Sequence, residues 1–169
     1  MANHLIRTEV YRFPVWAVIL MPLLALLLQA FLPRWLPAAA ALDLALLVTI
    51  YFAFNRRSQV AGLLLGAVIG LVQDSLGAGP IGVFGLVKTV IGYLASSLGV
   101  RLDVEHPGTR LLIVFAFYYM HLGLFLVVQR VLLERELELP GLSSLFVALV
   151  NAVSAVLIFQ LMDRLRERE

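Results

Sequence analysis

Six long apolar segments alternate with short polar separators along almost the whole chain. A helix that crosses a membrane needs about 20 predominantly apolar residues, and each segment comes close to that length. The separators hold prolines, glycines and charged residues, which are typical of helix ends and turns. The pattern predicts one domain, residues 1–169, with six membrane helices at residues 13–32, 36–54, 59–76, 81–100, 111–133 and 142–162. The boundary between the first two segments is weak, so five spans remain the alternative.

Composition narrows the class of protein. The chain is 62% hydrophobic and 14% charged, whereas a soluble domain carries about 25% charged residues. The apolar runs are continuous, and the strands of a membrane barrel alternate instead. The first run is longer than the apolar core of a signal peptide, so we expect it to be retained. We therefore predict an all-α integral membrane protein, a compact bundle of six helices in a lipid bilayer.

The distribution of arginines predicts the orientation in the membrane. If the N-terminus is cytoplasmic, nine arginines fall on that side and three on the other. Cytoplasmic loops are enriched in basic residues, so both termini are predicted to be cytoplasmic. The nine are Arg7, Arg12, Arg56, Arg57, Arg101, Arg110, Arg164, Arg166 and Arg168, and the three are Arg34, Arg130 and Arg135.

Small residues recur every three or four positions in the third and fourth segments, which places them on one face of each helix. They are Gly62, Gly66 and Gly70 in the third segment, and Gly85, Gly92 and Ser96 in the fourth, where Lys88 fills the position between Gly85 and Gly92. Small residues let membrane helices approach closely. A short turn containing Gly79, Pro80 and Gly82 joins the two segments, and Asp74 precedes it. We expect two helices packed backbone to backbone.

Four polar residues lie deep within apolar segments, namely Asp43, Lys88, His121 and Asn151. At about 1.5 Å per residue, all four lie roughly 11–15 Å from a helix end. Charged groups in lipid are costly and face the interior of a bundle. We expect one polar cluster with an Asp43–Lys88 ion pair, and Asp74 as the competing partner of Lys88. A buried salt bridge that fixes helix register and a substrate or proton pathway both remain open.

The sequence offers little catalytic chemistry. It contains no serine-hydrolase, P-loop or zinc-protease motif. An intramembrane aspartyl protease would need Asp43 and Asp74 to face each other, and Lys88 favours ion pairing instead. The absence of cysteine excludes disulfides and thiolate metal sites, and the net charge of +2 does not indicate nucleic-acid binding. We expect no catalytic residues, no metal and no cofactor.

Residues 62–99 resemble the MreD family of bacterial rod-shape-determining membrane proteins. The resemblance follows the order G-x3-G-x3-D, then G-P-x-G, then G-Y. It is carried by Gly66, Gly70, Asp74, Gly79, Pro80, Gly82, Gly92 and Tyr93. Within the family, Asp74, Gly79, Pro80 and Gly82 correspond to positions with a structural role or a partner contact.

The resemblance implies a non-enzymatic, multi-pass subunit of the elongation machinery (the elongasome or rod complex) in the bacterial cytoplasmic membrane. Such a scaffold would hold MreC, be linked to MreB, RodA and a penicillin-binding transpeptidase, and help regulate peptidoglycan synthesis and cell shape. It also implies a fold similar to the substrate-binding subunits of energy-coupling-factor vitamin transporters. The alternative function is such a transport subunit, with Asp43, Lys88, His121 and Asn151 lining its pocket.

Overall fold

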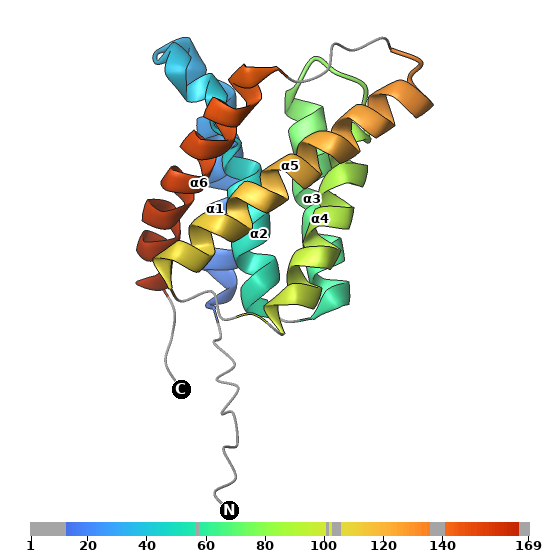
Figure 1. Ribbon diagram of the computed structural model, residues 1–169. Coiled ribbons are helices and arrows are strands. Elements are labelled where there is room, and N and C mark those ends of the chain that lie inside the picture. The colour runs from blue at the N-terminus through green and yellow to red at the C-terminus, as the bar shows by residue number, and fades with distance from the viewer. Residues whose placement is uncertain (1–12, 57, 101, 103–105, 136–140, 166–169) are drawn as a thin grey trace, which may run out of the picture.

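The computed structural model describes residues 13–56, 58–100, 102, 106–135 and 141–165. All regular secondary structure within these residues is helical (Figure 1). In chain order the α-helices are α1 (Val15–Phe31), α2 (Leu44–Arg56), α3 (Gln59–Leu76), α4 (Val83–Gly99), α5 (Pro107–Leu132) and α6 (Leu142–Asp163). Two short 3-10 helices, η1 (Leu32–Arg34) and η2 (Pro37–Ala41), lie between α1 and α2.

Helix α2 forms the centre of the bundle. Every residue from Ala45 to Phe54 is buried, and α2 contacts α1, α3, α4, α5 and α6. A helix that is apolar on all sides is stable only inside a bundle or a membrane, and here protein surrounds it. Helices α3 and α4 pack side by side, and α5 crosses the bundle obliquely (Figure 1). The start of α1 and the end of α6 lie at one end of the bundle, which we call the terminal end.

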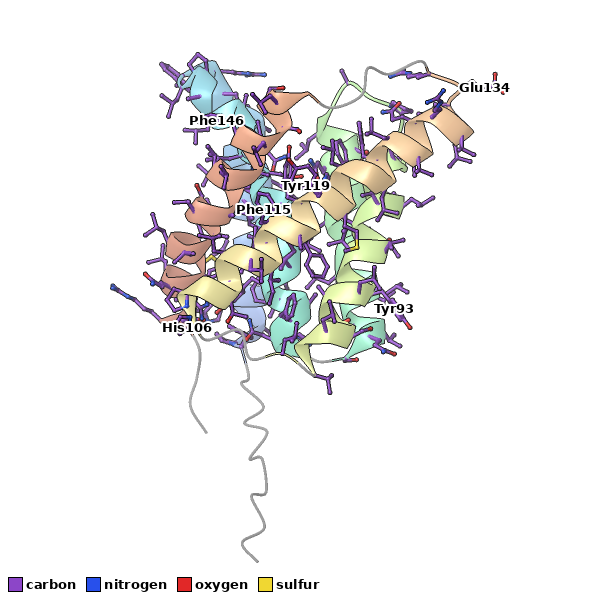
Figure 2. The ribbon with its side chains drawn as sticks, in the orientation of Figure 1. Tyr93, His106, Phe115, Tyr119, Glu134 and Phe146 are labelled. Atoms are coloured by element: carbon purple, nitrogen blue, oxygen red, sulfur yellow. The ribbon has the colours of Figure 1, made fainter. Side chains whose placement is uncertain are left out.

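Within the described residues, four helical segments are long and apolar enough to cross a membrane, namely Val15–Arg34, α3, α5 and α6. Their outer faces carry large exposed apolar side chains such as Ile19, Val68 and Leu157. Phe146 of α6 and Tyr93 of α4 also lie on the outer surface (Figure 2). Helices α2 and α4 are shorter, with 13 and 17 residues. At 1.5 Å per residue, α2 spans only about 20 Å of a hydrocarbon layer about 30 Å thick.

The second predicted helix, residues 36–54, is wrong as one continuous element. The structure divides it into η2 and α2, with Leu42 in an extended conformation between them. The physical cause is Asp43, whose carboxylate accepts a hydrogen bond from the backbone N–H of Leu46 at 2.9 Å. A side chain that caps the first turn in this way favours a new helix start over continuation. Asp43 therefore lies at a helix terminus, not seven residues inside a helix.

The remaining predicted segments differ only at their ends. Helix α5 begins at Pro107, four positions before the predicted start, because His106 caps it by accepting the N–H of Gly108. Proline at the first helical position needs no hydrogen-bond partner for its nitrogen.

Six arginines used to predict the orientation lie outside the described residues: Arg7, Arg12, Arg57, Arg101, Arg166 and Arg168.

Candidate functional site

Helices α3 and α4 form the most extensive helix–helix contact in the structure. A Cβ atom added at Gly66 would lie 2.0 Å from the carbonyl oxygen of Lys88, and one at Gly70 would lie 2.2 Å from that of Phe84. At Gly62, the added atom would lie 2.4 Å from the carbonyl oxygen of Gly92. These neighbours are backbone atoms that cannot swing aside. The three glycines therefore allow the close approach that their spacing predicts.

The facing positions on α4 are less uniform. A Cβ at Gly92 would lie 2.1 Å from the carbonyl oxygen of Gly62, so this position also has no room for a side chain. At Gly85 the nearest atom, at 2.8 Å, belongs to the flexible side chain of Leu71. Ser96 is buried and donates its hydroxyl to the carbonyl of Gly92 at 2.8 Å, within its own helix. Ser96 thus packs beside Gly62 without needing a partner from α3.

Asp74 joins the two helices at their turn. Its carboxylate accepts hydrogen bonds from the backbone N–H groups of Gly82, Phe84 and Gly85, at 2.9, 3.1 and 3.0 Å. These groups lie at the start of α4, where N–H donors have no partner within the helix. A carboxylate is also favoured at the positive end of the helix dipole. Asp74 therefore caps α4 from α3 and is not the ion-pair partner of Lys88.

The turn before α4 needs glycine at one position for its backbone. Gly82 has φ of +106°, in the left-handed region that residues with a Cβ rarely adopt. A Cβ would meet nothing within 4 Å at either Gly82 or Gly79, but Gly79 does not have a positive φ that would require glycine. Pro80 is half-buried and lies between α3 and this turn. The structure thus gives Asp74 and Gly82 definite structural roles, whereas Gly79 lies on an open surface.

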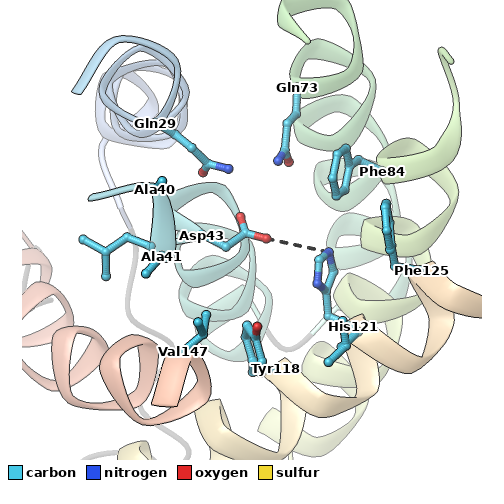
Figure 3. Close-up of a pocket in the computed structure, with 12 residues that line it drawn as sticks. Gln29, Ala40, Ala41, Asp43, Gln73, Phe84, Tyr118, His121, Phe125 and Val147 are labelled. Atoms are coloured by element: carbon cyan, nitrogen blue, oxygen red, sulfur yellow. Dashed lines mark ion pairs between the residues drawn. The ribbon is translucent and has the colours of Figure 1, made fainter. Parts of the chain in front are cut away.

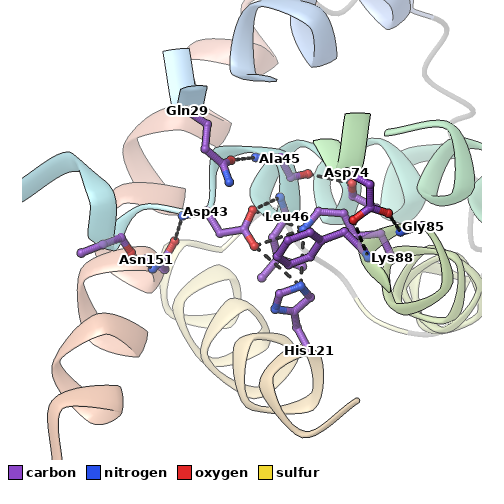
Figure 4. A network of polar contacts seen from close by, with 12 residues as sticks. Gln29, Asp43, Ala45, Leu46, Asp74, Gly85, Lys88, His121 and Asn151 are labelled. Atoms are coloured by element: carbon purple, nitrogen blue, oxygen red, sulfur yellow. Dashed lines mark hydrogen bonds and ion pairs between the residues drawn. The ribbon is translucent and has the colours of Figure 1, made fainter. Parts of the chain in front are cut away.

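The predicted polar cluster is assembled around Lys88 (Figure 4). Its ammonium lies 3.1 and 3.3 Å from the two carboxylate oxygens of Asp43 and 3.4 Å from Nε2 of His121. The ring of Phe84 lies 5.2 Å away, within cation–π range. His121 Nε2 is also 3.7 Å from Asp43 Oδ2. The Lys88 side chain is 0% exposed and that of Asp43 is 16% exposed, so this is a buried salt bridge joining α2, α4 and α5.

Asn151 belongs to the same region but serves the break before α2. Its side-chain oxygen accepts the backbone N–H of Asp43 at 2.8 Å, and its Nδ2 donates to the carbonyl of Ala41 at 2.7 Å. Gln29 of α1 acts similarly, because its oxygen accepts the N–H of Ala45 at 2.8 Å. Sequence reasoning placed Asn151 in the cluster but could not assign this role, since the break was not predicted.

A cavity of about 260 Å³ opens beside the cluster, between the end of α1 and the start of α4 (Figure 3). Its polar lining comes from Asp43, His121 and three residues that the sequence did not single out: Gln29, Gln73 and Tyr118. Neutral amide and phenol side chains cost far less in a membrane than charges do. Their position therefore gave no signal comparable to that of Lys88. Among the described residues, no group of three or more His, Cys, Asp or Glu side chains could hold a metal ion.

A comparison with protein-family models matches residues 9–165 to the family described as rod shape-determining protein MreD. The match covers nearly the whole chain. The chain belongs to the MreD family. No curated protein and no solved structure matched it, so the expected similarity to energy-coupling-factor subunits stays a prediction. MreD membership and the long apolar helices together make this a multi-pass membrane protein with a role in determining cell shape.

Proposed function

We propose that this MreD-family protein is a non-enzymatic scaffold of the cell-elongation machinery in the bacterial cytoplasmic membrane. Its direct partner is MreC, and through this complex it is linked to MreB, RodA and a penicillin-binding transpeptidase that lengthen the cell wall. The observation that carries the proposal is the family match over residues 9–165.

The distribution of polar groups is consistent with a scaffold. The carboxylate of Asp74 caps a helix, and Asp43 and Lys88 neutralise each other in the core. Asn151 satisfies the backbone at the helix break. These side chains are used to fix helices against one another. A membrane subunit built in this way presents partners with a rigid surface.

The tip of the α3–α4 hairpin is the surface that we propose for MreC. Ile81 in this tip is 74% exposed, and Leu76 at the end of α3 is also exposed. The glycine contacts and the Asp74 cap hold the tip in place. Exposed apolar side chains on a rigid support are typical of a partner surface.

The described arginines support an orientation that puts the tip outside the cytoplasm. Arg56, Arg110 and Arg164 lie at helix ends on the terminal side of the bundle, and Arg34 and Arg130 lie near the opposite ends of α1 and α5. With the basic side cytoplasmic, both termini are cytoplasmic and the hairpin tip faces the compartment where peptidoglycan is made.

The test is recovery of MreC with the affinity-tagged protein from bacterial membranes. We expect Ile81→Asp to reduce recovery at least tenfold and to fail to restore rod shape in a strain lacking the protein. Val60→Asp is the matched control, because Val60 is similarly exposed at the other end of the same helix pair. Equal recovery with both variants would refute the tip as the contact, and no recovery with the wild-type protein would refute the scaffold itself. A vitamin retained at stoichiometric amounts would favour the transport alternative.

A further inference from the structure

We propose that the cavity beside Asp43 is a binding site for a small, flat, uncharged molecule that both donates and accepts hydrogen bonds. This inference does not depend on the scaffold function, since it concerns the interior of the bundle and not the surface that meets MreC. It rests on an unpartnered amide, on the placement of the charges and on an aromatic wall, all of which belong to the same cavity.

The first observation is the side chain of Gln73. Its amide oxygen is buried and has no hydrogen-bond partner among the described residues. Figure 3 shows the Gln73 amide pointing into the cavity, towards Gln29 on the opposite wall, and Tyr118 lies at the far side. A buried polar atom without a partner is costly unless something else satisfies it. A ligand with a hydrogen-bond donor in the cavity would do so once the Gln73 amide rotates towards it.

The second observation concerns charge. The carboxylate of Asp43 lines the cavity, whereas Lys88 lies behind it and is fully buried. An anion in the cavity would face this carboxylate. A cation would compete with Lys88 for the carboxylate and leave a buried ammonium without its counter-charge, which is strongly unfavourable. The arrangement therefore selects against ligands of either sign.

The third observation is the aromatic part of the cavity wall. The rings of Phe84 and Phe125 are stacked with centroids 5.2 Å apart, and Phe84 lies nearly parallel to His121 at 6.0 Å. All three line the cavity. Flat rings pack well on such surfaces. The volume of about 260 Å³ lies just below the usual range of about 300–1,000 Å³ for ligand pockets, so the ligand is small.

Benzamide, benzoate and benzamidine provide a direct test, because they share one ring and differ mainly in charge. Each would be titrated into the purified full-length protein in detergent, with dissociation constants measured by ligand-observed NMR. We expect saturable benzamide binding at least about tenfold tighter than that of the anion or the cation. Absence of saturable benzamide binding, or equal binding of all three compounds, would overturn the proposal.

Gln129 provides a matched control for Gln73. Its amide oxygen is also buried without a partner among the described residues, but it does not line the cavity. Gln73→Leu should weaken benzamide binding at least about tenfold, while Gln129→Leu should leave it unchanged. If Gln73→Leu does not fold, Tyr118→Phe removes only a hydroxyl and should weaken binding severalfold. An equal effect of the Gln73 and Gln129 variants, or unchanged binding in Tyr118→Phe when Gln73→Leu is unfolded, would refute the site.

Discussion

Replacing Lys88 by methionine tests the buried ion pair most directly. Methionine fills a similar volume but removes the ammonium, which leaves the Asp43 carboxylate with the N–H of Leu46 and with His121 at 3.7 Å. Breaking a buried ion pair typically costs about 3–5 kcal/mol. Because the Asp43 side chain is 16% exposed towards the cavity, we expect the lower end, about 3 kcal/mol. That is a large share of the about 5–15 kcal/mol by which proteins are stable.

Adding Asp43→Asn to Lys88→Met should recover most of the lost stability. The second substitution removes the stranded charge, and an asparagine oxygen can still accept the N–H of Leu46 to cap α2. We expect the double variant to lie within about 1 kcal/mol of the wild-type protein, a recovery of about 2 kcal/mol relative to Lys88→Met alone, so the effects of the two single substitutions are far from additive.

The measurement is equilibrium unfolding of the wild-type protein, Lys88→Met, Asp43→Asn and their double variant in mixed detergent micelles, with SDS as denaturant. Lys88→Met combined with Asp74→Asn is the control, because Asp74 is a similarly buried carboxylate whose hydrogen bonds go to the start of α4. The effects of Asp74→Asn and Lys88→Met on the free energy of unfolding should simply add. If the Asp43 double variant is as unstable as Lys88→Met alone, the reasoning fails.

Three other substitutions separate helix packing, capping and the helix break. Gly66→Leu forces side-chain atoms against the backbone carbonyl of Lys88 and should destabilise the protein by about 3 kcal/mol or more. Gly79→Leu is the control, because Gly79 has open space around it, and it should keep the wild-type melting temperature. Similar melting temperatures of the two variants would contradict the close packing of α3 and α4. Asp74→Ala removes a cap and should cost about 2 kcal/mol and speed hydrogen exchange in the first turn of α4, whereas unchanged exchange would exclude the capping role. Asn151→Leu leaves two backbone groups unpaired and should cost about 2–4 kcal/mol in the unfolding assay, and a loss below about 0.5 kcal/mol would argue that water replaces the amide.

The features that could be predicted from the sequence are those with a large energetic signal in a membrane. Lys88 is costly in lipid unless it is paired, so its partner had to be another deep polar residue, and Asp43 is that partner. Three glycines at four-residue spacing lie on one helix face whatever the rest of the fold, and they do meet α4.

The features that could not be predicted from the sequence are those that depend on hydrogen bonds between distant parts of the chain. Asp74 looked like a possible ion-pair partner, but its three hydrogen bonds to the start of α4 exist only once the turn has its shape. The cavity was missed for a similar reason, since Gln29 and Gln73 come from different helices and neither is charged. Apolar periodicity alone also could not separate η2 from α2, because both parts are strongly apolar.

The break before α2 accounts for much of the polar chemistry in the bundle. Non-helical backbone is tolerated at membrane depth only where protein or water satisfies its N–H and C=O groups. Here Asn151 binds both sides of the break, at Ala41 and Asp43, and Gln29 accepts the next free N–H at Ala45. Asp43 then caps α2 and pairs with Lys88.

Because the break shortens α2 to 13 residues, the space at its end is not filled by another helical turn, and the cavity lies there, lined in part by residues 40–43. The same interruption thus places a carboxylate at the cavity wall and requires Asn151 and Gln29 nearby. A continuous helix over residues 36–54 would need neither amide, because its backbone groups would pair within the helix. The polar cluster and the cavity are therefore two consequences of one broken helix.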